Sequence, residues 1–483
     1  MHLNVFCVLH HPRDSDVCFE TLGQNKSFLF CDFEMSSSTT TTPKRPPVGG
    51  PKANQVPDEI LYDPVLNRRI AASLPDNYSF EIHKTIWRIR KVGAKRVALQ
   101  FPDGLFIFAV PIVNLLKEFL LDEVEFVIMA DVVYGACCVD DCKAKELGCD
   151  MIVHYGHSCL VPINTMAGGL VVLYVFVDIK FDILHLIQTV ATNFRPEEHR
   201  LCIASTIQFV SSAHVAAREL RDQHHFEVVV PQSRPLTPGE ILGCTAPFLD
   251  EHHVNTLVFV ADGRFHLEAL MIANPGLAAY KYNPYSKELT REYYANEAML
   301  SQRSAAVEKM VTVLRGDDGT TCGGAVGLIL GTLGRQGNFT VLETLKALIG
   351  DVSPSTPVVT YLMSELNPVL LTELAGARKG GDGKSGKIAA WVQIGCPRLS
   401  IDWGDAFVDR PLLSPYELRT AVRNLQAEKR QKKEEEEEKN PEPNFTKDGR
   451  YHMDFYATKS LGAWTPSHRC HTECECAGGV VKA

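Results

Sequence analysis

The sequence lacks any apolar run long enough to cross a membrane. Its best apolar stretch, Leu170 to Val177, is eight residues long and is closely followed by Asp178, Lys180 and Asp182. A spanning helix needs about 20 apolar residues, so this run indicates a strand in a protein core. The first residues lack the basic and apolar parts of a secretory signal. We therefore expect a cytoplasmic protein with no membrane partner.

The sequence also lacks an excess of positive charge. Lysine and arginine number 49 against 58 aspartate and glutamate residues, which gives a formal net charge of −9. Nucleic-acid-binding proteins usually carry a surplus of basic residues. We therefore expect no nucleic-acid partner, and a protein or small molecule in its place.

Cysteine, in contrast, is plentiful, with fifteen residues in the chain. In a small secreted protein this number would suggest disulfides, but here the cysteines are spread over a large chain without a signal. We interpret them as reduced thiols, some of which are able to hold a metal.

Both ends of the sequence have the composition of disordered tails. Residues 36–52 read SSSTTTTPKRPPVGGPK, a low-complexity segment. Met35 directly precedes it, and we interpret residues 1–34 as an extension upstream of the native start. Near the other end lie the charge run 429–439 and HRCHTECEC at 468–476. The latter contains Cys470, Cys474 and Cys476, but an incidental tail is favoured over a metal site.

Between the tails, short Val/Ile-rich segments alternate with amphipathic stretches, which is typical of parallel α/β structure. The expected strands form three groups of three: 95–104, 124–138 and 149–159; 200–209, 226–244 and 254–266; 325–338, 357–368 and 387–404. We predict three similar α/β domains with parallel-rich sheets, in a pseudo-three-fold arrangement, between disordered N- and C-terminal tails. A helical connector is expected over residues 286–316. The predicted parts are an extension over 1–64, domains over 65–188, 189–300 and 301–412, and a helical, charged tail over 413–483.

Each group carries one cysteine in a loop after a strand: Cys137, Cys244 and Cys396. Open α/β sheets place ligands at the carboxyl ends of their strands, so one shared face can gather three thiolates. Thiolates suit iron–sulfur clusters and zinc, and three protein ligands leave one position open. A cysteine after a strand is more often a small buried hydrophobe, so spacing alone leaves both interpretations open.

Longer motifs carry a resemblance to a known family. They are LQFPDGL (99–105), DVVYGACCVDDCKAKELGCDMIVHYGHSCLVP (131–162), LTPGEILGCTAP (236–247), GCPRLSIDWG (395–404) and YHMDFYATKSLGAWTP (451–466). They resemble the diphthamide synthase family, the 2-(3-amino-3-carboxypropyl)histidine synthases, over roughly residues 60–465. Within the family the chain is similar to subunit 1 of the eukaryotic heterodimer, since the paralogous subunit is expected to lack the cysteine at position 244.

The resemblance implies a [4Fe–4S] cluster held by Cys137, Cys244 and Cys396, with S-adenosylmethionine at its open iron. The implied enzyme is a radical-type transferase that moves the 3-amino-3-carboxypropyl group to the imidazole C2 of a histidine in elongation factor 2, the first step toward diphthamide. The implied partners are a paralogous second subunit, elongation factor 2 as substrate and a small electron-donor protein.

Some residues depart from the expected patterns. Cys142 and Cys149 add thiols near Cys137, and His452 stands where the family pattern has proline. The motif C-x3-C-x2-C of conventional radical enzymes is incomplete, because Cys138 and Cys142 are followed by Lys145. The incomplete local motif is consistent with cluster ligands that come from separate domains.

Polar loop residues beside the expected centre are candidates for cofactor contacts, although such loops are often polar merely to satisfy the backbone. They are Gln100, Asp103, Gly104, His154, Tyr155, Gly156, His157, Ser158, Gly334, Arg335 and Gln336. His154 and His157 are candidate proton acceptors, and no residue is singled out as catalytic.

Two other functions stay open from the residues. One is an electron-relay or scaffolding subunit, and the other is a zinc enzyme with a three-cysteine site. The segment GDGKS (381–385) is not interpreted as a phosphate loop, because Arg378 replaces the first glycine and a strand follows instead of a helix.

Overall fold

The computed structural model describes residues 6–8, 55–120, 123–316, 324–376, 388–407, 409–431, 450–456, 458 and 465–466. Most of the expected N-terminal tail, the GDGKS segment, most of the charge run and the HRCHTECEC segment lie outside the described residues. No helix among the described residues combines the length and the apolar character that crossing a membrane requires.

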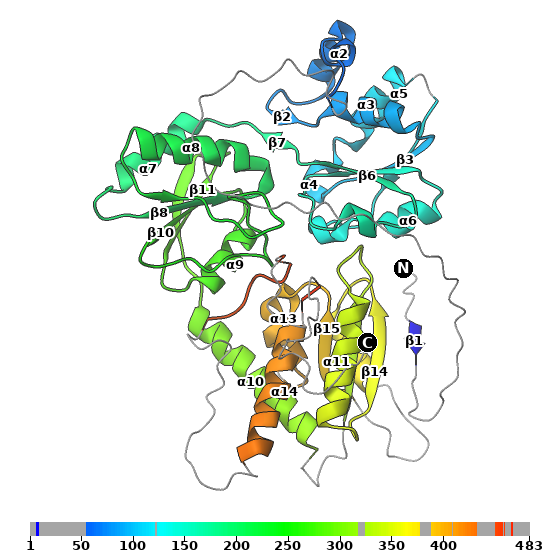
Figure 1. The fold of residues 1–483 in the computed structure, drawn as a ribbon, viewed down its shortest axis with the longest axis vertical. Helices are drawn as coiled ribbons and strands as arrows, with labels where there is room; N and C mark the ends of the chain where they lie inside the picture. Colours follow the sequence, from blue (N-terminus) through cyan, green and yellow to red (C-terminus); the bar gives the residue numbers. More distant parts are fainter. Residues whose placement is uncertain are drawn as a thin grey trace, which may run out of the picture.

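The fold consists of three α/β units, each built on its own parallel sheet (Figure 1). The first sheet has the order β4 (Glu125–Met129), β3 (Arg96–Gln100), β5 (Met151–Tyr155) and β6 (Val171–Val175). The second has β9 (Val228–Val229), β8 (Leu201–Ser205), β10 (Thr256–Val260) and β11 (Ala278–Asn283), with β12 (Glu288–Glu292) antiparallel at its edge. The third has β14 (Val358–Met363), β13 (Ala325–Gly331), β15 (Ile388–Ile394) and β16 (Leu412–Leu413), and β1 (Phe6–Val8) pairs antiparallel with β14.

The four parallel strands have the same order in all three units. Counting only these four strands, the second in the chain comes first in the spatial order, followed by the first, the third and the fourth. Repetition of one strand order confirms the predicted parallel-rich α/β class. The pseudo-three-fold arrangement in space and the domain boundaries stay predictions.

Helices cover the sheets, which is why the strands are apolar. The first unit has α1 (Asp58–Leu61), α2 (Pro64–Ser73), α3 (Ile82–Val92), α4 (Asp103–Phe106), α5 (Ala109–Phe119), η1 (Ala136–Cys138), α6 (Asp141–Glu146) and η2 (Ile163–Thr165). The short β2 (Tyr78–Ser79) and β7 (Asp178–Ile179) pair beside it. The second unit has α7 (Ile183–Asn193), η3 (Ile207–Phe209), α8 (Val210–Asp222) and α9 (Phe265–Ala273). The third has α10 (Asn296–Arg315), α11 (Phe339–Val352), α12 (Pro368–Gly376), α13 (Arg398–Asp402), η4 (Gly404–Phe407) and α14 (Pro415–Gln431).

The central strands are buried along their whole length. Every residue of β5, β8 and β10 is buried, as expected where helices cover both faces of a parallel sheet. Figure 1 shows α7 and α8 on one face of the second sheet and α9 on the other. This layering leaves the loops at the strand ends as the places where functional residues lie.

The predicted helix over 286–316 is only partly correct. Its C-terminal part is α10, but Glu288–Glu292 forms strand β12, which pairs antiparallel with β11. Glu288 and Arg291 are exposed and only Glu292 is half-buried, which suits a charged edge strand. Arg291 lies over the ring of Tyr280, with 4.7 Å between its guanidinium carbon and the ring centroid, a cross-strand contact that charge composition does not reveal.

A buried ion pair joins the helices of the third unit. Helix α14 packs against α10 and α11. Arg303 of α10 contacts Glu417 of α14 through two hydrogen bonds of 2.6 and 2.9 Å, and their side chains are 1% and 0% exposed. Arg303 also donates to the carbonyl of Leu412, and the hydroxyl of Tyr451 donates to Glu417 at 2.9 Å. The pair thus connects two helices, a strand and the C-terminal segment.

We predict that Arg303→Ala lowers the free energy of unfolding by about 3–5 kcal/mol, because it leaves the carboxylate of Glu417 buried without its cation. Arg69→Ala is the matched control, since Arg69 pairs with Glu118 at an exposed site and should cost about 1 kcal/mol or less. Urea unfolding followed by tryptophan fluorescence measures both. Equal losses in the two variants would contradict the prediction.

Candidate functional site

Loops from all three units surround one cavity of about 510 Å³. Its lining includes Cys137 from the first unit, Cys244 from the second and Cys396 from the third. A volume of this size falls within the range of small-molecule sites, roughly 300–1,000 Å³. The structure therefore brings together three cysteines that lie more than one hundred residues apart in the sequence.

Of the neighbouring thiols in the first unit, Cys137 is the one that lines the cavity. Cys138 is fully buried, and its sulfur accepts a hydrogen bond of 3.3 Å from the amide of Gln336. Cys142 is exposed, and Cys149 is buried in the core beneath the first sheet. Cys142 and Cys149 therefore lie away from the site, whereas Cys138 packs beside Cys137 behind the cavity.

The loop that carries Cys244 turns tightly beside the start of α9. Leu242 and Thr245 exchange backbone hydrogen bonds of 3.1 and 3.2 Å around Gly243 and Cys244. A Cβ atom at Gly243 would lie 2.1 Å from the ring of Phe265, so only glycine permits this approach. The turn directs Cys244 toward the units that hold the other two cysteines.

Cys396 lies between the end of β15 and the start of α13, two residues from each. Its carbonyl accepts hydrogen bonds from the side chain of Gln393 at 2.8 Å and from the backbone amide of Leu399 at 3.1 Å. These bonds fix the backbone on both sides of the thiol.

The surroundings of the three thiols disfavour their thiolate forms. A hydrogen bond to Cys138, together with burial, raises the pKa of Cys137 well above its ordinary value. Burial raises the pKa of Cys244 to about 12 and that of Cys396 to about 11. Metal ligation requires thiolates. A positively charged inorganic group in the cavity would supply the compensating charge that these sulfurs lack.

Arg398 connects the Cys396 loop to the second unit. The buried guanidinium donates to Glu268 at 2.6 Å and to the carbonyl of Phe265 at 2.9 Å, and pairs with Asp402 at 2.9 Å. Its central carbon lies 4.3 Å from the centroid of the Phe265 ring. Since Arg398 is two residues from Cys396 and packs on the ring that touches Gly243, it sets the relative position of two of the thiols.

The third unit contacts the first unit in a similar way. Arg335 donates two hydrogen bonds to Asp141, at 2.7 and 2.5 Å, and its backbone amide donates to the carbonyl of Cys137 at 2.8 Å. Gly334 has a φ of +53°, and a Cβ atom there would lie 2.5 Å from the backbone of Cys138. The Gly334–Gln336 loop therefore packs directly against the backbone that carries Cys137.

Only Gln336, of the eleven loop residues predicted to contact a cofactor, lines the cavity. Gly334 and Arg335 position the Cys137 loop instead. Asp103 and Gly104 are exposed at the start of α4.

The remaining predicted contacts lie in or beside the core of the first unit, and Gly156 also contacts the second unit. His154 hydrogen-bonds Gln100 at 2.8 Å and His157 at 3.1 Å, and Gln100 donates to the carbonyl of Cys138 at 2.9 Å. Tyr155 stacks on Phe101 in the core, with centroids 4.4 Å apart. Ser158 is buried, and the Gly156 carbonyl accepts from Gln208 at 2.5 Å. Through Gln100, the two histidines contact the backbone beside Cys137. The assignment of the loop residues as cofactor contacts stays a prediction.

Several residues that line the cavity were not predicted from the sequence. They include Phe265, His266, Glu365, Arg398 and Asp402. Burial lowers the pKa of His266 to about 4, so its imidazole is neutral near pH 7. The motif GCPRLSIDWG contains Arg398 and Asp402, but nothing in its pattern indicates that the arginine reaches another unit.

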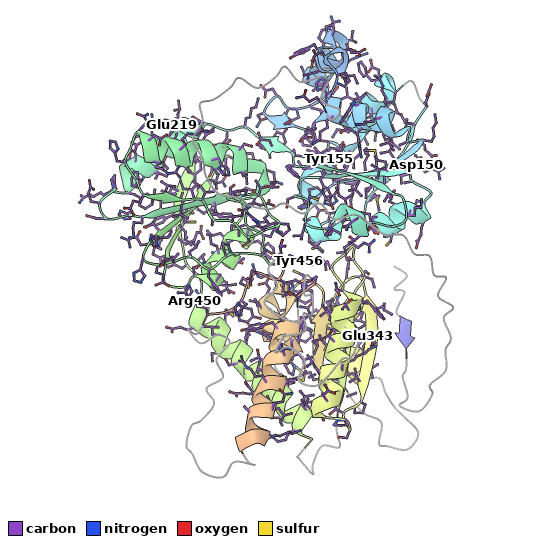
Figure 2. The ribbon with its side chains drawn as sticks, viewed as in Figure 1. Asp150, Tyr155, Glu219, Glu343, Arg450 and Tyr456 are labelled. Carbon is purple, nitrogen blue, oxygen red and sulfur yellow. The ribbon has the colours of Figure 1, made fainter. Side chains whose placement is uncertain are left out.

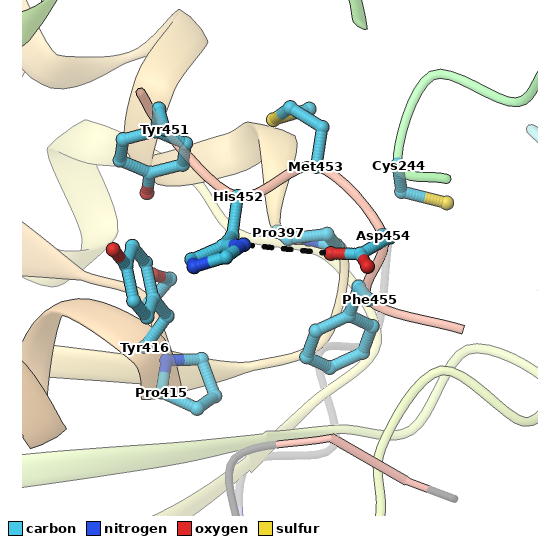
Figure 3. Close-up of a pocket in the computed structure, with 10 residues that line it drawn as sticks. Cys244, Pro397, Pro415, Tyr416, Tyr451, His452, Met453, Asp454 and Phe455 are labelled. Carbon is cyan, nitrogen blue, oxygen red and sulfur yellow. Dashed lines mark ion pairs between the residues drawn. The ribbon is translucent and has the colours of Figure 1, made fainter. Parts of the chain in front are cut away.

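The C-terminal segment 450–456 also reaches the site. Met453 accepts a backbone hydrogen bond from Ala246 at 2.7 Å, and Phe455 donates one to the carbonyl of Cys244 at 3.1 Å. Figure 3 shows the segment around a second, small cavity of about 20 Å³ beside Cys244. His452, the departure from the family pattern, lies 3.9 Å from Asp454 there and packs 5.3 Å from the ring of Tyr416.

Comparison with known proteins identifies the family. The sequence model described as "Putative diphthamide synthesis protein" matches residues 101–434. A bovine (Bos taurus) protein named 2-(3-amino-3-carboxypropyl)histidine synthase subunit 1 is 46% identical over 419 residues, 87% of this chain and 84% of that one. A protein of the same name from Schizosaccharomyces pombe is 45% identical over 442 residues, 90% of this chain and 89% of its own.

The chain belongs to the diphthamide synthesis protein family. The crystal structure of Dph2 from Pyrococcus horikoshii with a 4Fe-4S cluster has the same fold, with a TM-score of 0.55 and 22% identity over 71% of this chain and 91% of that one. The resemblance read from the motifs is thereby confirmed.

The residues of the cavity fit an iron–sulfur cluster. Three soft thiol donors from three directions surround a space of about 510 Å³, and soft thiolates select such clusters. The fit is one of donor chemistry and available space, since no group of three or more His, Cys, Asp or Glu side chains among the described residues is already arranged to hold a metal ion. The assignment of the three cysteines as ligands stays a prediction.

The Asp141–Arg335 pair predicts a pH-dependent stability. Burial alone would raise the pKa of Asp141, but hydrogen bonds from Arg335 and the Ala167 amide outweigh it, and the pKa is lowered. A lowered folded-state pKa contributes stability that is present above the unfolded value, about 3.9, and that is lost as the pH falls through the folded value.

We therefore expect Asp141→Asn to lower the free energy of unfolding by about 2 kcal/mol near pH 7. The difference from wild type should shrink as the pH falls below about 4, because the wild-type carboxylate then loses its charge. Thermal unfolding across pH 3–7 would measure this, with the exposed Asp76→Asn as control. A difference that stays constant with pH would argue against the assigned role.

Proposed function

We propose that this chain is the cluster-bearing subunit of a 2-(3-amino-3-carboxypropyl)histidine synthase, which performs the first step of diphthamide biosynthesis. The observation that carries the proposal is the convergence of Cys137, Cys244 and Cys396 on one cavity. Relatives that share this name, at 45–46% identity, support it.

The three cysteines would hold a [4Fe–4S] cluster and leave one iron open. When bound, the cluster would supply the electron that cleaves the bond between the sulfonium sulfur and the γ-carbon of S-adenosylmethionine, releasing 5′-methylthioadenosine. The freed 3-amino-3-carboxypropyl group would add to the imidazole C2 of a histidine in elongation factor 2, and loss of the C2 proton and of one electron would restore the aromatic ring. The protein's own part is to hold the reactants in the cavity, to limit their contact with water and to orient them.

The lining of the cavity suits a cationic co-substrate. Glu365 and Asp402 place two carboxyl groups on it, and Phe265, Leu366 and Trp403 provide apolar surface. The cation of Arg398 is already engaged by Glu268, Asp402 and the carbonyl of Phe265. We therefore assign Arg398 and its partner Asp402 to positioning the thiols and the Phe265 ring, and the carboxylate of Glu365 to the positive charges of S-adenosylmethionine.

The cavity also bears on the electron-relay hypothesis. A cluster that only passes electrons needs no space for a substrate beside it, whereas a volume of about 510 Å³ adjoins the three cysteines. We therefore place the transferase ahead of the relay or scaffold. No observation favours the hypothesis of a zinc enzyme with a three-cysteine site.

The proposal includes the partners and the location. A paralogous second subunit would complete a heterodimer, elongation factor 2 would present the target histidine, and a small protein would deliver electrons. We expect the reaction in the cytoplasm, without a membrane or nucleic-acid partner.

We predict that Cys244→Ala abolishes the assembly of a reducible four-iron cluster after anaerobic reconstitution with iron and sulfide. Cys244 is the informative ligand, because its loop has no neighbouring thiol that can replace it. Cys202→Ala is the matched control, since Cys202 is a free, fully buried cysteine in β8 of the same unit. Iron and sulfide content and low-temperature EPR spectra report on cluster assembly.

The two variants should differ in cluster content and in transfer activity. Wild type and Cys202→Ala should show the same EPR signal of the reduced cluster and should transfer the group to elongation factor 2 in the presence of the second subunit. A cluster that persists unchanged in Cys244→Ala would refute the ligand assignment. A cluster without any transfer activity would favour the electron-relay hypothesis.

A further inference from the structure

The aromatic ring of Tyr456 lies where the three units meet (Figure 2). It packs against the small apolar cluster that contains Cys137, Cys138 and Leu242, and Cys244 lies beside the same cluster. The side chain comes from the C-terminal segment, more than two hundred residues after Cys244 in the sequence. A fourth part of the chain therefore contributes to the three-cysteine site.

The backbone of the segment holds this tyrosine in place. Thr245 and Asp454 form an antiparallel bridge, and the Phe455 amide donates to the carbonyl of Cys244 at 3.1 Å. The amide of Tyr456 itself contacts the hydroxyl of Thr245 at 3.4 Å. At the other end of the segment, Arg450 pairs with Glu251 at 3.2 Å. The segment is thus docked as an extra strand on the loop that carries Cys244.

The hydroxyl of Tyr456 is buried and has no hydrogen-bond partner among the described residues. A buried phenol O–H without an acceptor is unfavourable, and in a native structure such a group calls for an explanation. Burial raises the pKa of this phenol, and the next contributions come from Cys137, Cys244 and Cys396 in turn. The hydroxyl is therefore an unpaired proton donor on a ring that packs against the apolar cluster containing Cys137, with Cys244 beside it.

We propose that the hydroxyl of Tyr456 donates a hydrogen bond to a sulfur atom of the cluster bound by the three cysteines. This inference rests on the proposed function. Sulfur atoms of a reduced cluster carry negative charge and are better acceptors than neutral thiols. A hydrogen bond to sulfur stabilises the reduced state and raises the reduction potential of the cluster. Docking of the C-terminal segment thus makes the cluster easier to reduce.

The test compares the midpoint potential of the reconstituted cluster in the full-length chain and in Tyr456→Phe, which keeps the ring and removes only the hydroxyl. The variant should bind the same iron and sulfide as wild type, and its midpoint potential should be more negative. The matched control is Tyr451→Phe, which removes a buried hydroxyl from the same segment. That hydroxyl donates to Glu417, so the potential should stay at the wild-type value.

Other outcomes would overturn the inference. An unchanged midpoint potential in Tyr456→Phe would refute the proposed hydrogen bond and leave the proposed function intact. An equal shift in Tyr451→Phe would attribute the effect to displacement of the segment. If wild type assembled no cluster, the proposed function would fail as well.

A second measurement covers the case in which Tyr456→Phe assembles too little cluster. Pulsed EPR of the reduced wild-type protein, exchanged into D2O, should detect a deuteron coupled to the cluster. The absence of any coupled deuteron would reject the hydrogen bond.

Discussion

The candidate site depends on one interaction above all, the engagement of the buried Arg398 guanidinium by a different unit of the fold. Arg398 belongs to the helix that follows Cys396, and its partners Glu268 and the carbonyl of Phe265 belong to α9 of the second unit. Removing such a cation would leave carboxylates poorly compensated and the ring of Phe265 without its planar partner. Because that ring also packs on Gly243, the position of Cys244 relative to Cys396 follows from this contact.

Contacts from other parts of the chain also position the backbone of Cys137 and of Cys244. Arg335 and Gly334 of the third unit hold the backbone of Cys137 and Cys138, and the segment 450–456 holds the backbone of Cys244. Each thiol is therefore placed by a contact from another part of the chain and not by its own loop alone. Such contacts keep buried sulfurs in position before any metal neutralises them, which is what preorganisation of a site requires.

The parts of this structure that were predictable from the sequence are those decided by local patterns. Apolar runs such as Met151–Tyr155 and Thr256–Val260 are the buried strands they indicate, and the cysteines after the strands line one cavity. Long-range contacts were not predictable. Glu288–Glu292 is a strand because of its partner β11, and Gln100 and His154 face each other within the first unit. Arg398 and Tyr456 belong to quoted motifs, but only the fold reveals which unit each side chain reaches.

A site assembled in this way couples cofactor binding to the folding of the entire chain. A C-x3-C-x2-C motif places its ligands within one loop, so such a loop is able to bind a cluster whether or not distant domains are in contact. Here the ligands are separated by more than one hundred residues, so the binding free energy of the cluster is also free energy of docking between the three units. Loss of the cluster should then loosen the unit interfaces, and loosening of an interface should release the cluster. The contacts of Arg398 and Arg335, which cross from one unit to another, are where this coupling would act.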